Sequence, residues 1–158
     1  MATTFVTLDR TDPSESKGFW MQDWCLELWL RLLALHLPEP TDSGEHAATT
    51  MIRDQWLSSS KGCCIGGVLE DAGATPEGRD VVRIAVNSLL VDLNRQSAPL
   101  DPATLNLLGM EGSWGEPVDR QPLREVGQAF LDLLDGKIKT GPSSVEIMPG
   151  LKPYPPSA

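Results

Sequence analysis

An apolar stretch near the N-terminus limits what this chain can form. Residues 18–40, "GFWMQDWCLELWLRLLALHLPEP", contain three tryptophans and many leucines. A membrane-spanning helix needs about 20 predominantly apolar residues, and Asp23, Glu27 and Arg31 interrupt this stretch. We therefore expect no membrane span here.

The spacing of these three charges predicts a helix packed on most of its sides. Asp23, Glu27 and Arg31 are four residues apart, so they share one narrow stripe of a helix. The rest of the circumference is apolar: Trp20, Met21, Trp24, Cys25, Leu28, Trp29, Leu32, Leu33 and Leu35. Such a helix is typical of the centre of a bundle, with Trp24 and Leu28 buried inside the monomer. The alternative is that a second chain covers part of this surface.

Four short signals predict helix starts. In "DPSE", Asp12 is a candidate N-cap, with Pro13 at the first helical position and Glu15 completing a capping box. Similar signals occur at residues 42–45, 75–78 and 101–104. Apolar residues at helical spacing follow, and the last helix stops at Gly136. The predicted fold is all-α, a compact bundle of four main helices plus one or two short ones.

The two ends of the chain have a different pattern. "TFVTL" at residues 4–8 and "SVEIM" at residues 144–148 both alternate, so the termini can pair as a small two-stranded ribbon. The last residues are rich in proline, which favours an extended or disordered tail. We expect one helical domain at residues 1–140 and a C-terminal Pro-rich extension at residues 141–158.

The net charge of the chain limits the classes of molecule that it is expected to bind. The 158 residues include 22 acidic and 13 basic ones, a formal net charge of −9. Such a charge disfavours nucleic acid and anionic membranes and favours a basic protein partner. The opening "MATTFVTLDR" lacks the features of a secretory signal, and three cysteines are too few for a disulfide framework. We expect a cytoplasmic protein.

Candidate catalytic and metal sites are weak. Cys63 and Cys64 lie among glycines, but they lack the C-x-x-C spacing of a zinc site, and we interpret them as small buried residues. His36 and His46 flank one connection, where they could form an acid–base pair or simply occupy helix ends. No nucleophile or carboxylate cluster accompanies them, so we expect no enzyme, no metal and no cofactor.

Trp114 is the best candidate for a binding residue. It lies in "GMEGSWGEPVD", residues 109–119, a glycine-rich segment without helical periodicity. A large aromatic residue on an acidic loop can anchor a partner, with Glu111, Glu116 and Asp119 attracting a basic surface. The alternative is that Trp114 folds back as a lid over the helices.

These features predict a small acidic cytoplasmic binding protein that neutralises a basic protein partner, of the immunity-protein or antitoxin type. A homo-oligomeric scaffold, adaptor or chaperone is the first alternative, and a homodimer is compatible with both. The second alternative is a small enzyme or ligand-binding bundle that uses the Cys63–Cys64 segment.

Overall fold

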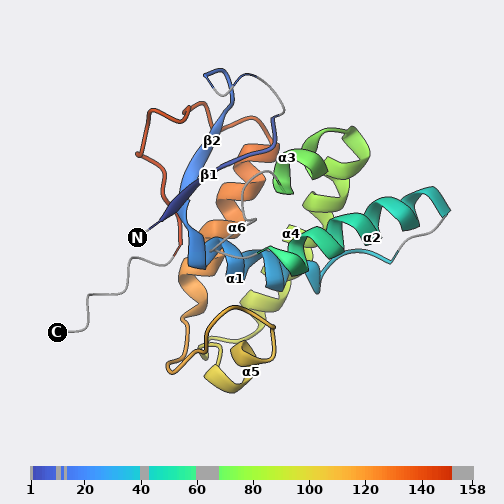
Figure 1. The fold of residues 1–158 in the computed structure, drawn as a ribbon. Helices are drawn as coiled ribbons and strands as arrows, with labels where there is room; N and C mark the ends of the chain where they lie inside the picture. Colours follow the sequence, from blue (N-terminus) through green and yellow to red (C-terminus); the bar gives the residue numbers. More distant parts are fainter. Residues whose placement is uncertain (1, 10–11, 13, 40–42, 60–67, 151–158) are drawn as a thin grey trace.

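The computed structural model describes residues 2–9, 12, 14–39, 43–59 and 68–150. In this part of the chain the secondary structure is mostly helical, with six helices and one small two-stranded sheet (Figure 1). The mostly helical content agrees with the prediction, which also allowed a small two-stranded ribbon. The sheet is part of the folded body, however, and the fold is not simply a bundle of four main helices.

Strands β1, Thr3–Thr7, and β2, Gly18–Gln22, form an antiparallel hairpin in which Thr3 pairs with Gln22. The prediction of a strand near the N-terminus is confirmed, but the predicted partner at residues 144–148 is wrong. That segment instead runs along the other side of β2, where Trp20 N donates to the carbonyl of Ile147. A nearby strand pairs at a lower entropic cost of loop closure than a distant one.

The "DPSE" segment forms a turn of this hairpin, which corrects the predicted helix start. The carboxylate of Asp12 accepts a hydrogen bond from Ser14 N, and its carbonyl accepts one from Glu15 N. Capping hydrogen bonds of this kind also close single turns, and here strand β2 follows the turn instead of a helix. Helix α1 begins eleven residues later, at Asp23.

Helix α1, Asp23–Ala34, is the central element, because it contacts α2, α4 and β2. Figure 1 shows it crossing the middle of the molecule. Leu28 is completely buried, as predicted, whereas Trp24 is only partly buried. Glu27 and Arg31 are buried as well, so α1 is covered even along its charged stripe.

Three further long helices and two short ones complete the fold. The long helices are α2, Ser43–Ser58, α4, Pro76–Arg95, and α6, Arg120–Leu134; the short ones are α3, Val68–Gly73, and α5, Pro102–Asn106. Thr75 and Asp101 cap α4 and α5 as predicted, each accepting a backbone hydrogen bond. The predicted cap at Asp42 lies outside the described residues. Figure 1 shows α2 projecting from the rest of the molecule.

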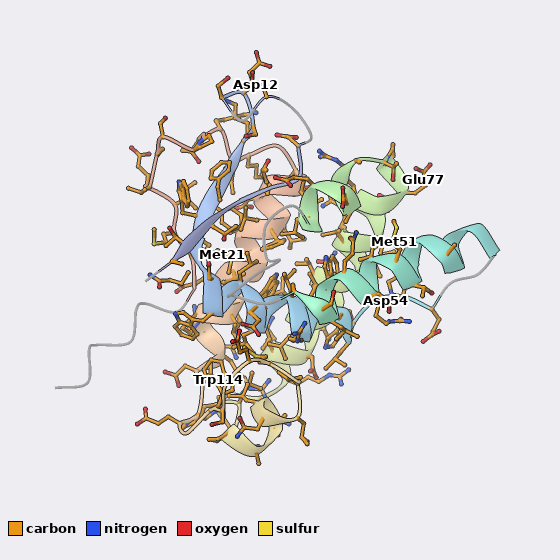
Figure 2. The ribbon with its side chains drawn as sticks, in the orientation of Figure 1. Asp12, Met21, Met51, Asp54, Glu77 and Trp114 are labelled. Atoms are coloured by element: carbon orange, nitrogen blue, oxygen red, sulfur yellow. The ribbon has the colours of Figure 1, made fainter. Side chains whose placement is uncertain are left out.

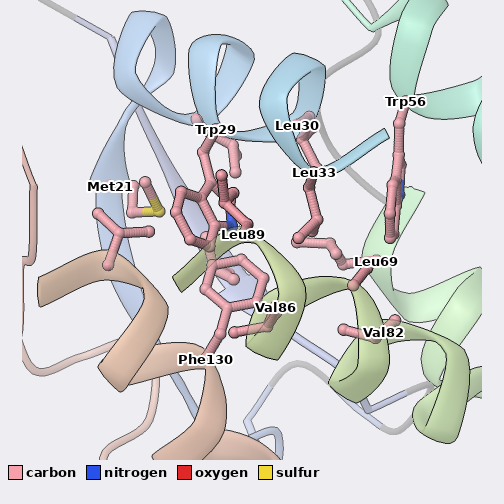
Figure 3. Close-up of a cluster of buried hydrophobic side chains, with 14 of the residues drawn as sticks. Met21, Trp29, Leu30, Leu33, Trp56, Leu69, Val82, Val86, Leu89 and Phe130 are labelled. Atoms are coloured by element: carbon pink, nitrogen blue, oxygen red, sulfur yellow. The ribbon is translucent and has the colours of Figure 1, made fainter. Parts of the chain in front are cut away.

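One hydrophobic core joins α1, α4, α6 and the hairpin (Figure 3). Phe130 of α6 lies at its centre, with its ring 5.5 Å from that of Trp29 and 5.6 Å from that of Phe19. Val86 and Leu89 of α4 pack in the same cluster. These contacts pack α1, α4, α6 and the hairpin around one core.

The segment after α6 returns to the folded body. The indole nitrogen of Trp20 donates to the carbonyl of Pro142, and Gly150 lies directly over Cys25 and Val126. A Cβ at residue 150 would come within 2.7 Å of the Cys25 sulfur, and the φ of +104° also favours glycine. The predicted domain boundary at residue 140 stays a prediction, and residues 151–158 lie outside the described part.

A helix that crosses a membrane must be long and mostly apolar. Among the residues that the structure describes, none of the helices combines the length and apolar character that crossing a membrane requires.

Candidate functional site

Helix α5 precedes the predicted binding segment, residues 109–119, and its first turn is fixed by Asp101. The Asp101 carboxylate accepts hydrogen bonds from the backbone N–H of Thr104 at 2.9 Å and from its hydroxyl at 3.0 Å. Both bonds favour the charged form, and they hold the pKa of Asp101 below its ordinary value. Leu105 is buried in the core, so the short helix is attached to the body.

Asn106, the last residue of α5, closes the loop that follows. Its side-chain oxygen accepts from Trp114 N at 2.6 Å, and its side-chain nitrogen donates to the Trp114 carbonyl at 3.1 Å. Gly109 and Gly112 have φ angles of +72° and +88°. These angles favour glycine and let the chain reverse direction between Asn106 and Trp114. One amide side chain therefore satisfies both backbone groups of Trp114.

A second contact holds the end of the segment. Leu100 and Val118 form an isolated antiparallel bridge, with backbone hydrogen bonds of 2.8 and 2.9 Å. The residues between them include α5 and the loop. The bridge therefore closes residues 101–117 into a loop whose two ends lie side by side.

The ring of Trp114 packs on that of Trp24 in α1. Their ring centroids are 5.7 Å apart and their planes are tilted by 53°. Both side chains are partly buried at the edge of the core. Figure 2 shows Trp114 at the end of the molecule away from Asp12 and Glu77. The indole therefore contacts the helical body, and its predicted role as a partner anchor stays a prediction.

Glu27 attaches the middle of the loop to α1. Its side chain is completely buried, and Oε1 accepts a hydrogen bond from the backbone N–H of Glu111 at 3.1 Å. One turn further along α1, Arg31 donates from Nη1 to the carbonyl of Trp56 at 2.6 Å. The charged stripe of α1 thus contacts the loop and α2. Sequence reasoning placed these charges on one stripe but missed these contacts.

The predicted carboxylates are displayed on this segment. The side chains of Glu111, Glu116 and Asp119 are exposed. Residues 101–119 contain four acidic residues and no lysine or arginine, so they carry four of the nine net negative charges. The structure places these three residues on one anchored segment, and their role in binding stays a prediction.

The nearest arginines in the sequence bind elsewhere. Arg120 donates from Nε to the Ala98 carbonyl at 2.6 Å, and Arg124 donates from Nη2 to the Leu93 carbonyl at 2.8 Å. In the described part of the chain, no ion pair includes Glu116 or Asp119. The negative charge of these two carboxylates is therefore available to a partner.

Leu107 is a residue that sequence reasoning missed. Its side chain is 85% exposed, the highest value among the large apolar residues in the described ranges. It follows α5 directly and precedes the acidic loop. The sequence does contain a signal for this exposure. Leu107 is two residues from Leu105, and residues two apart lie on different sides of a helical turn.

The remaining candidates for catalysis or metal binding lie only partly within the described residues. Within the described ranges, no cluster of three His, Cys, Asp or Glu side chains could hold a metal ion. An open hollow along α2 is lined by Ala47, Thr50, Met51, Asp54, Gln55 and Ser58, and the Ser58 hydroxyl donates to its own helix. Cys63 and Cys64 lie outside the described residues, so their interpretation stays a prediction.

His36 lies just after the end of α1 and contacts α4. Its Nδ1 is 2.9 Å from the Ser88 hydroxyl, and its Nε2 is 3.7 Å from a carboxylate oxygen of Asp92. Burial lowers the pKa of His36, and Asp92 opposes this effect only in part. The expected stabilisation of a cation at this helix end is therefore outweighed by burial. The side chain of His46 lies outside the described part.

Comparison of the chain with protein-family models, with curated proteins and with solved structures gives no match. Its function must therefore be argued from the arrangement of its own residues.

Proposed function

We propose that this protein is a small acidic binding protein that neutralises a basic protein partner, of the immunity-protein or antitoxin type. In this proposal a bundle of α1, α2, α4 and α6 carries the binding loop, defined as residues 107–117. One observation carries the proposal. The loop displays exposed carboxylates on a backbone that Asn106 and Glu27 already hold in place. A loop held in this way loses less conformational entropy when it binds.

The charge of the molecule supports a basic partner. Four of the nine net negative charges lie in residues 101–119. A concentrated charge of one sign attracts a surface of the opposite sign and raises the rate of association. The same charge disfavours nucleic acid and anionic lipid as partners. The cytoplasm stays the predicted compartment.

We assign different roles to the residues of the loop. Glu111 and Glu116 attract the partner, and the partly exposed Trp114 together with the exposed Leu107 provides apolar contact. Charges at the rim of an interface mainly affect association, whereas buried apolar anchors mainly affect dissociation. Asp119 lies directly before α6 and adds to the same negative segment.

The first experiment is capture of the partner from the native cell with the tagged full-length chain. Association and dissociation rates are then measured at two ionic strengths. The Glu111→Lys, Glu116→Lys double variant should lower the association rate, and the effect should shrink as salt rises. Glu111→Lys keeps the backbone N–H that donates to Glu27, so the loop stays attached.

Glu77→Lys is the matched control, because Glu77 is exposed and lies far from Trp114 (Figure 2). It should change the association rate much less than a reversal in the loop. Trp114→Ala should weaken binding by more than about 1 kcal/mol through faster dissociation. If the association rate is indifferent to salt and all these variants bind like the parent chain, the loop is not the interface.

The enzyme alternative rests on Cys63 and Cys64. Replacing both with alanine should leave partner binding nearly intact, and the purified protein should contain no stoichiometric metal. One zinc ion per chain would overturn our interpretation of that segment.

A further inference from the structure

Helix α4 has an apolar pair on the side opposite the core. Val82, Val86 and Leu89 are buried in the hydrophobic core (Figure 3). Ile84 and Val91 are 50% and 56% exposed. They are seven residues apart, which is about two helical turns, so they lie on one stripe of the helix.

Polar residues extend this stripe in both directions. Asp80, Asn87, Ser88 and Arg95 are exposed, and helical spacing places them on the same side as the apolar pair. Within the described residues, neither Asp80 nor Arg95 makes an ion pair or a side-chain hydrogen bond. We call this set the α4 stripe: Asp80, Ile84, Asn87, Ser88, Val91 and Arg95.

We propose that the α4 stripe is a self-association surface, and that two copies of the chain pack α4 against α4 in antiparallel orientation. A twofold axis between Asn87 and Ser88 lies equally far from Ile84 and Val91. Each Ile84 then meets Val91 of the second copy. The same axis lies equally far from Asp80 and Arg95, so each Asp80 meets Arg95 of the second copy.

The charge pattern favours a second copy as the occupant. An acid at one end of the stripe and a base at the other are complementary to themselves only when the helices run antiparallel. A parallel pair would bring Asp80 against Asp80 and Arg95 against Arg95, which is unfavourable. One stripe therefore supplies both the apolar contact and two opposite-charge pairs. This inference does not depend on the function proposed for the binding loop.

The expected dimer is weak. A single pair of helices buries a small interface, and such interfaces give modest affinity. The net charge of −9 on each copy adds repulsion, which salt screens. Dimerisation should therefore be measured near physiological ionic strength and over a wide concentration range.

The test is sedimentation velocity of the full chain from about 1 μM to about 1 mM, a range that detects dissociation constants of those orders. We expect a monomer at the low end and a dimer at the high end. Ile84→Asp and Val91→Asp should each raise the dissociation constant about tenfold or more. Val145→Asp is the matched control, because Val145 is 67% exposed and lies outside α4.

Charge reversal distinguishes this arrangement from nonspecific association. Asp80→Arg and Arg95→Asp should each weaken the dimer, because each creates two like-charge pairs. The double variant carrying both substitutions should restore it, since the pairs re-form with opposite sign. Circular dichroism controls for the fold, because both reversals oppose the helix dipole.

A chain that stays monomeric at every concentration would overturn the proposal. So would a dimer that the single reversals leave unchanged, or a double variant that associates no more tightly than the single ones.

Discussion

The buried carboxylate of Glu27 accepts a hydrogen bond from the backbone N–H of Glu111, 84 residues further along the chain. A buried charge is costly unless hydrogen bonds compensate it. This contact therefore joins the central helix α1 to the loop that carries Glu111 and Glu116. It also makes the position of the loop depend on the interior of the protein.

Removing the carboxylate should loosen the loop. Glu27→Ala leaves the Glu111 N–H without this acceptor and creates a small cavity, so we expect the free energy of unfolding to fall by about 1–3 kcal/mol. Glu27→Gln keeps an acceptor oxygen and should cost less. Urea denaturation measures both losses, and amide exchange at Glu111 reports on the loop itself. Unchanged exchange at Glu111 in Glu27→Ala would show that the hydrogen bond does not hold the loop.

Local signals in the sequence correctly predicted where two of the helices begin. Thr75 and Asp101 cap the helices that they were expected to cap, because a cap and its helix lie within one turn of each other. Asp12 carries the same signal but closes a hairpin turn, since the following residues pair with β1. A capping motif predicts a turn, and the residues after it decide whether a helix follows.

The site itself could be predicted only in part. The acidic segment around Trp114 was visible because composition and the absence of helical periodicity are local properties. The contacts of Glu27 with Glu111 and of Trp24 with Trp114 were not, because they join residues far apart in the chain. Sequence spacing places residues on a face of a helix, but tertiary packing decides what covers that face.

The contact between the indoles of Trp24 and Trp114 provides a second prediction. Trp24→Ala and Trp114→Ala should each destabilise the protein, but less than Trp29→Ala, which removes a fully buried ring and should cost about 3–5 kcal/mol. A double-mutant cycle between Trp24 and Trp114 should give a coupling of about 0.5–1.5 kcal/mol. Denaturant unfolding of the four proteins measures it.

The cycle has a matched control in Trp20, which packs against Phe5 instead. The effects of Trp20→Ala and Trp114→Ala should add within about 0.5 kcal/mol. Equal coupling in both cycles would mean that the measured energy does not come from the ring contact.

Two glycines inside helices should respond differently to alanine. A helix interior normally favours alanine over glycine by about 1 kcal/mol. At Gly78, however, the added Cβ would collide with the backbone carbonyl oxygen of Ala72. At Gly127 it would meet the end of the flexible Leu90 side chain, which can move. Gly78→Ala should therefore lower the free energy of unfolding by more than about 2 kcal/mol, and Gly127→Ala should cost clearly less.

Thermal and urea unfolding of these two variants provide the measurement. If Gly78→Ala is as stable as the parent chain, then α3 and α4 are not packed as closely as the structure places them.

The partly buried position of His36 predicts a loss of stability in mild acid. Burial lowers the pKa of folded His36 below its ordinary value, so the unfolded chain binds a proton at higher pH than the folded one. The free energy of unfolding should therefore be fully retained above about pH 6.5 and should fall as the pH drops below it. Asp92 should make this fall smaller than burial alone would, because its charge favours the protonated ring.

His36→Asn removes the titration and keeps a side chain that can reach the Ser88 hydroxyl. We expect the variant to lose less stability than the parent chain between about pH 7.5 and pH 5.5, measured by urea unfolding at several pH values. His46→Gln is the control, since His46 is the other histidine of the chain. If His36→Asn has the same pH dependence as the parent while His46→Gln flattens it, the proton responsible binds His46. In that case burial of His36 between α1 and α4 does not control stability in acid.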